Sequence, residues 1–276
     1  MRYKDTEWDF RTADTKEYTH CFHNYPAMMI PQISRTLLSQ YGLENGWLLD
    51  PYCGTGTSLV EASLFSMNSV GCDINSLARL IATAKTTVVP LKALDHHLED
   101  LNNYIFKTGF TGNTPEVSIP DVLNLEYWFS KEVMNFLLFL REYIISVKNE
   151  AVRNFFWVAF SETVRECSYT RNSEFKLYRM PAQKLEDFTP DVLGIFHTKL
   201  IRNQRGLECY LEKRKQVEVI ISDSNTAEGE ILKQPPIQGF DLVITSQNLE
   251  PYIDEIFVAS PDGAYVTVNN VVINSG

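Results

Sequence analysis

Two acidic residues follow short apolar stretches, at positions where a carboxylate can bind a sugar. Asp50 comes directly after residues 47–49 and leads into a loop that holds Gly54 and Gly56. Neither glycine carries a Cβ and both can adopt a positive φ, so the backbone of this loop can approach a ligand closely. Asp73 ends the next apolar stretch, where α/β nucleoside-binding folds place a carboxylate that accepts both ribose hydroxyls. The spacing predicts a nucleoside-binding turn.

Two better-known glycine loops do not fit these residues. A dinucleotide-binding loop needs a third glycine, and that position holds Leu59. A phosphate-binding loop needs Gly-Lys followed by Ser or Thr, which this loop lacks. The expected ligand is therefore a nucleoside without a pyrophosphate. An alternative stays open, because Gly-x-Gly is weak evidence by itself: both carboxylates can be turn formers and the glycines a tight loop.

The composition indicates an ordered α/β protein that does not coat nucleic acid indiscriminately. The chain has 276 residues, 44% of them hydrophobic, and a formal net charge of -10. Residues 151–215 hold 12 Lys and Arg against 8 Asp and Glu, a local charge of +4 that leaves -14 for the rest of the chain. We expect phosphate contacts in that stretch.

The cysteines and the N-terminus indicate a reducing, cytoplasmic location. The five cysteines are scattered without a Cys-x-x-Cys pair, which favours reduced thiols over disulfides or a metal site, and we expect all five to be packing residues. The N-terminal residues contain no signal peptide, and no apolar run approaches the length of a membrane span. We expect a soluble protein with no membrane partner.

Regular alternation of strands and helices is expected at both ends of the chain, with helices between them. Apolar spacing predicts helices over 31–41 and 75–85, and Thr57 or Ser58 can cap a helix between them. The alternation stops at Pro90. Further helices are expected at residues 91–104, after Ser130, from about Glu150 and after Thr189, before strands at 217–222 and 240–246.

The residues of the glycine loop resemble a known family. Asp50-Pro51-Tyr52-Cys53-Gly54-Thr55-Gly56-Thr57, followed by Asp73-Ile74-Asn75, is similar to the cofactor motifs of S-adenosylmethionine-dependent amino-methyltransferases that act on DNA. These are the adenine-N6 and cytosine-N4 enzymes of restriction-modification systems. The resemblance runs from about Tyr18 to Ser246.

That resemblance implies a fold and a division of the chain. The fold is the Rossmann-like parallel sheet of a class I methyltransferase, incomplete at the C-terminus, with a largely helical insertion between its second and third strands. Residues 1–90 form the N-terminal segment and the first half of the cofactor-binding domain. Residues 91–215 form the insertion with a basic, DNA-facing segment, and residues 216–276 the rest of the sheet and an altered catalytic loop.

The resemblance also implies which residues bind S-adenosylmethionine. Residues 18–27 are similar to the segment that closes over the methionine end of this cofactor, although its His and Tyr side chains can equally hydrogen-bond a loop over the core. The Asp after the third expected strand corresponds to the position that recognises the adenine amino group. The expected cofactor-binding residues are His23, Tyr25, Pro26, Asp50, Pro51, Gly54, Thr55, Gly56, Thr57, Asp73, Ile74 and Asp223.

The stretch 168–179 is polar, basic and aromatic together, which suits contact with a phosphate backbone and an unpaired base. It also resembles a stretch found in part of the DNA methyltransferase group. Arg171, Lys176 and Arg179 are expected to neutralise phosphates and Tyr178 to stack on a base. The alternative is a solvated loop with ion pairs to neighbouring glutamates.

The catalytic motif is recognisable only in part. Methylation of an exocyclic amine needs neither a metal nor a covalent enzyme intermediate, because the donor sulfonium is already activated. In the family, a Ser, Asp or Asn followed by Pro-Pro and an aromatic residue receives the flipped base. Here Ser246 begins such a motif, and the next Pro-aromatic pair ends at Tyr252, with extra residues between them. These two residues are the expected catalytic pair.

The chain has no room for a seven-stranded sheet after Ser246, and a hairpin around Asn269-Asn270 is the structure expected there. We therefore expect a cofactor-binding half, an altered reading frame, or one piece of a split enzyme whose second polypeptide supplies the missing strands. The expected substrate is double-stranded DNA. The alternatives are an RNA guanine-N2 methyltransferase, which shares the Asp-Pro-x-Cys-Gly-Thr-Gly-Thr turn, and an inactive fragment that binds S-adenosylmethionine or DNA.

Overall fold

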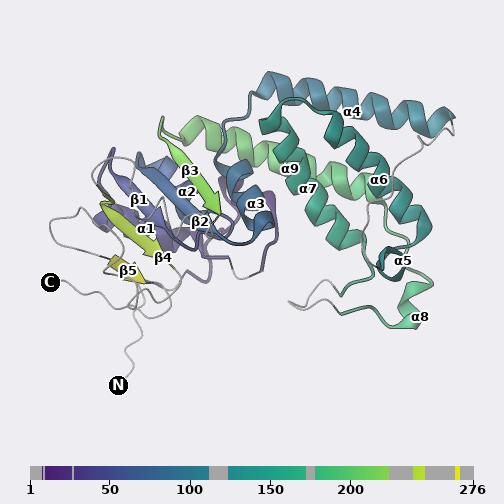
Figure 1. Cartoon of the computed structure of the whole chain (residues 1–276), viewed down its shortest axis with the longest axis horizontal. Coiled ribbons are helices and arrows are strands. Elements are labelled where there is room, and N and C mark those ends of the chain that lie inside the picture. The colour runs from purple at the N-terminus through teal and green to yellow at the C-terminus, as the bar shows by residue number, and fades with distance from the viewer. Residues whose placement is uncertain are drawn as a thin grey trace. The chain divides into compact units, whose positions relative to one another are not determined.

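The computed structural model describes residues 8, 10–26, 28–111, 124–171, 178–223, 239–245 and 265–267. The chain divides into two compact units (Figure 1). The sheet unit consists of Met1–Cys21, Ala27–Thr86 and Gly206–Gly276. The helical unit consists of Phe22–Pro26 and Thr87–Arg205.

A parallel sheet is the centre of the sheet unit (Figure 1). Its strand order is β3-β2-β1-β4-β5, and every neighbouring pair is parallel. This is the doubly wound order of Rossmann-like folds, in which ligands bind beyond the carboxyl ends of the strands. The predicted class I methyltransferase fold is confirmed. The strands are β1 (Trp47–Asp50), β2 (Asn68–Asp73), β3 (Val219–Asp223), β4 (Leu242–Thr245) and β5 (Tyr265–Thr267).

The central strands are the continuous apolar runs that the sequence predicts. β1 and β4 are buried along their whole length, as expected for parallel strands covered on both faces. Leu48 pairs with Ser69 of β2 on one side and with Leu242 of β4 on the other. The fifth strand, β5, was not predicted as a parallel neighbour of β4. The turn of the predicted hairpin, Asn269-Asn270, lies outside the described residues.

Three helices of the sheet unit lie between or before these strands: α1 (Pro31–Tyr41), α2 (Thr57–Phe65) and α3 (Ser76–Thr86). Helices α2 and α3 pack against each other, and each contacts strand β2. The predicted cap of α2 is wrong, because Gly56 is the N-cap and makes no side-chain bond. A core cluster joins α1 and α2 to the sheet through Leu37, Leu38, Leu48, Ala62, Met67, Leu242 and Ile244.

The helical unit contains Thr87–Arg205, most of the chain between β2 and β3, which confirms the predicted helical insertion. Its second long helix begins at the predicted cap, where the Ser130 hydroxyl accepts a hydrogen bond from Val133 N (3.2 Å). Phe155 and Phe156 are fully buried, as their helical spacing predicts. The helices of this stretch are α4 (Leu91–Thr111), α5 (Leu125–Trp128), α6 (Lys131–Ser146), α7 (Glu150–Cys167), α8 (Ala182–Leu185) and α9 (Val192–Lys213), and a 3-10 helix, η2 (Tyr18–Phe22), precedes α1.

Four of the five cysteines are buried free thiols, as expected of packing residues. Cys209 is exposed, so the expectation is wrong at that position. Among the described residues, no helix is long and apolar enough to cross a membrane.

Candidate functional site

The glycine loop after β1 has one packed side and one open side. Gly54 and Gly56 both adopt positive φ, 50° and 73°. A Cβ on Gly56 would lie 2.8 Å from the Cβ of Ala82 on α3, which is too close for two carbon atoms. A Cβ on Gly54 would meet no atom within 4 Å. Gly56 therefore permits the loop to pack on α3, whereas Gly54 leaves open space beside the backbone.

The buried side chain of Asp50 forms hydrogen bonds with the loop and with the start of α2. Its carboxylate is buried, accepts a hydrogen bond from Tyr52 N (3.2 Å) and accepts a second, short one from the Ser58 hydroxyl. Burial raises the pKa of Asp50 to about 7, although both hydrogen bonds oppose that shift. Pro51 and Thr55 are also buried in the loop. The side chain of Asp50 is bonded to the loop itself and fixes its shape.

Asp73, at the end of β2, joins the loop to the next strand. Its Oδ2 accepts a hydrogen bond from Gly54 N (3.0 Å) and its Oδ1 accepts one from Asn75 N (2.7 Å). Each carboxylate oxygen can accept a second hydrogen bond, so capacity remains for the hydroxyls of a ligand. Ile74 follows with 67% of its surface exposed. A carboxylate, an open backbone and an exposed apolar side chain thus meet at the carboxyl edge of the sheet.

Arg79 is a residue of this edge that no sequence pattern singled out. Its guanidinium donates to the carbonyl oxygens of Asp73 (2.6 Å) and Ile74 (2.9 Å) and lies 2.8 Å from Asp223 Oδ2. Asp223 also pairs with Asp73 in the register of the sheet. The carboxylate expected to recognise an adenine amino group is therefore an ion-pair partner of Arg79. This ion pair holds the ends of β2 and β3 together.

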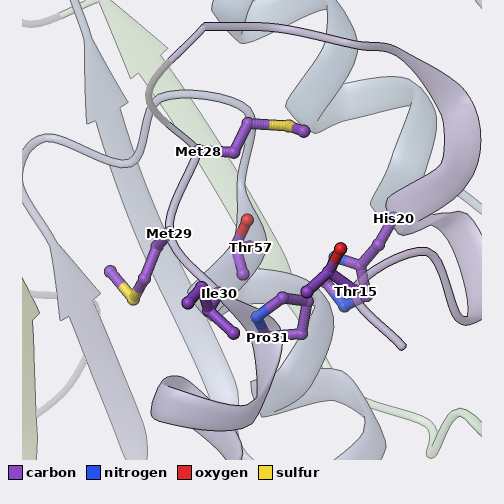
Figure 2. Close-up of a pocket in the computed structure, with 7 residues that line it drawn as sticks. All are labelled: Thr15, His20, Met28, Met29, Ile30, Pro31 and Thr57. Atoms are coloured by element: carbon purple, nitrogen blue, oxygen red, sulfur yellow. The ribbon is translucent and has the colours of Figure 1, made fainter. Parts of the chain in front are cut away.

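A pocket of about 100 Å³ lies beside the start of α2 (Figure 2). Thr57, the first residue of α2, contributes to its wall directly after the glycine loop. Most of the remaining wall comes from the segment that leads into α1. The lining residues are Thr15, His20, Met28, Met29, Ile30, Pro31 and Thr57.

A buried charged cluster adjoins this pocket at His20. The Nε2 of His20 lies 2.9 Å from Glu61 Oε1, and Arg35 donates two hydrogen bonds to the same carboxylate. Burial lowers the pKa of His20 to about 4, so the ring is neutral and donates from Nε2 to Glu61. Burial alone would raise the pKa of Glu61, but the hydrogen bonds from His20 and Arg35 hold it below its usual value.

Lys85 belongs to the same interior. It is 1% exposed, and its Nζ has no hydrogen-bond partner among the described residues. Burial lowers its pKa to about 7, and the charge of Glu61 only partly opposes that shift. No sequence pattern singled out this lysine as a buried residue.

The segment with His23, Tyr25 and Pro26 belongs to the helical unit. His23 is 4% exposed, and neither ring nitrogen has a hydrogen-bond partner among the described residues. Burial lowers its pKa to about 4, with the nearby charge of Glu162 opposing the shift. The ring of Tyr25 lies 6.4 Å from that of His23, and both Tyr25 and Pro26 are half-buried.

The two ends of the expected DNA-facing stretch pair with each other in antiparallel direction. Thr170 forms an isolated bridge with Arg179, and Arg171 N donates to Tyr178 O (2.8 Å). We call residues 169–171 and 178–180 the hairpin stem. Arg171 and Tyr178 are exposed, and Lys176 lies outside the described residues.

Arg179 is engaged with the rings of its own unit. Its guanidinium carbon lies 4.3 Å from the ring centroid of Tyr127 and 5.4 Å from that of Tyr169, and its Nε donates to Tyr127 O (2.9 Å). These are cation–π distances, so Arg179 joins the hairpin stem to α5. The expected catalytic pair, Ser246 and Tyr252, lies outside the described residues. β4 ends at Thr245, the residue before Ser246.

These features define a class of protein. A Rossmann-like parallel sheet, with a glycine loop after its first strand and a carboxylate at the end of its second, is the architecture of a class I methyltransferase. Residues 16–101 match the family described as RMKL-like, methyltransferase domain.

Curated relatives agree with that class. The chain is 37% identical to the type II methyltransferase M.MvaI of Kocuria varians over 89% of this chain and 55% of that protein. It is 32% identical to the type II methyltransferase M.MjaII of Methanocaldococcus jannaschii over 35% of this chain and 19% of that protein. It is also 42% identical to the tRNA (guanine(10)-N2)-dimethyltransferase of Methanothermobacter thermautotrophicus over 18% of this chain and 16% of that protein.

The similarity to M.MvaI confirms the predicted resemblance to methyltransferases of restriction-modification systems. S-adenosylmethionine is the methyl donor that this resemblance implies. The chain spans about half the length of M.MvaI.

Proposed function

We propose that this chain transfers a methyl group from S-adenosylmethionine to an exocyclic amino group of a DNA base, adenine N6 or cytosine N4, in a restriction-modification context. The observation that carries the proposal is the bond from Gly54 N to Asp73 Oδ2, which places an open backbone turn beside a carboxylate at the ligand-binding edge of the sheet. The similarity to M.MvaI over 89% of the chain supports it.

The donor fits the groups at this edge by their chemistry. Asp73 has hydrogen-bonding capacity left for ribose hydroxyls, and the exposed Ile74 offers an apolar surface for the adenine ring. Asp223 would accept from the adenine amino group while Arg79 holds it in place. The pocket beside Thr57 would receive the amino-acid end of the donor.

The remaining residues have roles in substrate binding and catalysis. When bound, the donor supplies an activated methyl group, so the protein needs only to orient the amine and accept its hydrogens. Ser246 would accept a hydrogen bond from the target amine and Tyr252 would stack on the flipped base. Arg171, Lys176 and Arg179 would contact phosphates of double-stranded DNA, and Tyr178 an unpaired base.

Transfer of tritiated methyl from labelled S-adenosylmethionine to duplex DNA tests the proposal. The purified chain is incubated with a duplex of random sequence, and the Asp73→Ala variant is the negative control. Label in adenine N6 or cytosine N4 after base hydrolysis is the expected result. Label with the wild-type chain only after addition of the second half of a relative such as M.MvaI would indicate that a second polypeptide is needed.

One observation favours an RNA substrate as a second candidate. The stretch that matches the tRNA (guanine(10)-N2)-dimethyltransferase is 42% identical over 52 residues. The same assay with transfer RNA distinguishes the DNA substrate from the RNA substrate. Label at guanine N2 of the transfer RNA, with none in DNA, would show that the substrate is RNA. If the chain binds the donor but labels neither nucleic acid, it is an inactive fragment that only binds S-adenosylmethionine.

A further inference from the structure

An exposed tyrosine of α5, Tyr127, is held in place by the hairpin stem. Its side chain reaches solvent, since the residue is 50% exposed, but its backbone is bonded at two consecutive carbonyls. Tyr127 O accepts a hydrogen bond from Arg179 Nε (2.9 Å), and Trp128 O accepts one from Tyr169 N (2.8 Å). All four residues belong to the helical unit, so the arrangement lies within one compact part of the chain. These bonds fix the backbone that carries the Tyr127 ring.

The ring of Tyr127 is also positioned by its neighbours. The ring of Trp128 stands at 88° to it, with ring centroids 4.9 Å apart. The guanidinium carbon of Arg179 lies over the Tyr127 ring, 4.3 Å from its centroid, and 5.4 Å from the centroid of Tyr169. The ring is therefore held before any ligand binds, although half of the residue is open to solvent. A group that is already in position loses less conformational freedom when it binds a ligand.

A cation and a second exposed ring accompany Tyr127. A guanidinium has five N–H donors, and the bond to Tyr127 O uses one of those of Arg179, so this residue has donors for a phosphate as well. Tyr178, the residue before Arg179, is 47% exposed. Exposed aromatic rings beside a cation are the groups that bind unpaired nucleotides, because bases stack on the rings while phosphates pair with the cation.

We propose that Tyr127 stacks on an unpaired base of the DNA, and that Arg179 holds the ring in position while it pairs with the neighbouring phosphate. The helical unit then binds one nucleotide through both its base and its backbone. Every base has a π face, so this contact favours unpaired DNA over paired DNA without selecting a sequence. The inference rests on the proposed function, because it takes DNA as the substrate.

The experiment separates base stacking from phosphate contact. Two duplexes are compared, each with a short bulge of unpaired nucleotides: one bulge carries thymine bases, and the other has abasic sugars joined by the same phosphates. Tyr127→Leu removes the aromatic ring and Tyr127→Phe keeps it. Tyr169→Leu is the matched control, because it removes the other ring beside Arg179. Fluorescence anisotropy gives the affinity of each protein for both duplexes, and the ratio of the two affinities is the readout.

We expect the wild type and Tyr127→Phe to prefer the bulge that carries bases, and Tyr127→Leu to lose about 10-fold of that preference. Tyr169→Leu should keep the wild-type ratio, even where it weakens binding to both duplexes through Arg179. The ratio does not depend on how much of a variant is folded, so a purely structural role of Tyr127 would leave it unchanged. A second measurement uses the wild type alone: irradiation of its complex with a bulge that contains 5-iodouracil should cross-link the base to Tyr127.

The same ratio in wild type and Tyr127→Leu, or the same loss in Tyr127→Leu and Tyr169→Leu, would overturn the inference. A cross-link to Tyr178 without one to Tyr127 would also overturn it. A wild-type chain that binds neither duplex and transfers no methyl group to DNA would instead overturn the proposed function, and this inference with it. A wild type that methylates DNA but does not distinguish the two bulges overturns the inference alone, so the two failures are distinguishable.

Discussion

Lys85 gives a prediction whose size follows from its burial. The ammonium is 1% exposed and has no hydrogen-bond partner among the described residues, and burial lowers its pKa from an ordinary 10.5 to about 7. The unfolded chain therefore binds more protons than the folded chain between pH 7 and pH 10.5, so this group makes the protein more stable as the pH rises through that window. Each pKa unit corresponds to about 1.4 kcal/mol, which gives a penalty of about 4 kcal/mol at pH 7 and about 2 kcal/mol at pH 9.

Lys85→Met keeps the length of the side chain and removes its charge. We expect the variant to exceed the wild type in free energy of unfolding, and its advantage to shrink by about 2 kcal/mol between pH 7 and pH 9. Urea unfolding followed by circular dichroism at both pH values measures this difference, with the exposed Lys92→Met as the control that should show no such trend. An advantage of the same size at both pH values would refute the reasoning, because Lys85 would then keep its ordinary pKa.

The other predictions concern the loop, the donor and the hairpin stem. Gly56→Ala should lower the free energy of unfolding by about 1–3 kcal/mol in urea titrations, because its Cβ would collide with α3 at a positive φ. Gly54→Ala should cost about 1 kcal/mol or less in the same titrations, yet weaken donor-product binding in calorimetry because its Cβ enters the open space. Asp73→Ala should weaken that binding at least 10-fold, and unchanged affinity would contradict the ribose assignment. Arg171→Ala should reduce the slope of the logarithm of the DNA-binding constant against the logarithm of salt concentration, by about the share of one phosphate contact. Fluorescence anisotropy measures the binding constants. Arg179→Ala should also lower the unfolding midpoint, because its guanidinium stacks on rings of its own unit.

The strands and the glycine loop could be predicted because their signals are local. β1 and β4 are apolar runs followed by polar residues, and the helix over 31–41 has the bounds that its apolar spacing indicates. The turn from Asp50 to Thr57 needs positive φ at two positions, and both hold glycine. In these places the local backbone conformation or the burial of the element determines which residue type fits.

The groups that were missed depend on contacts between distant parts of the chain. Arg79 is unremarkable in its helix until β3 brings Asp223 beside it, and Glu162 matters only because α9 and residues 22–26 meet it. Lys85 was missed for the same reason, since a helical lysine is exposed unless other elements cover it. The spacing of residues predicts which face of one helix or strand is buried. It does not predict which helices and strands pack against each other.

The membership of Phe22–Pro26 in the helical unit limits how the insertion can be exchanged or isolated. The chain enters that unit for five residues, returns to the sheet unit, and enters it again at Thr87. A fragment cut at residues 87 and 205 would lack the Phe22 ring that packs on Phe155, and Glu162 would be a buried acid without its amide donor. Grafts of the insertion between relatives therefore have to transfer the short N-terminal stretch as well.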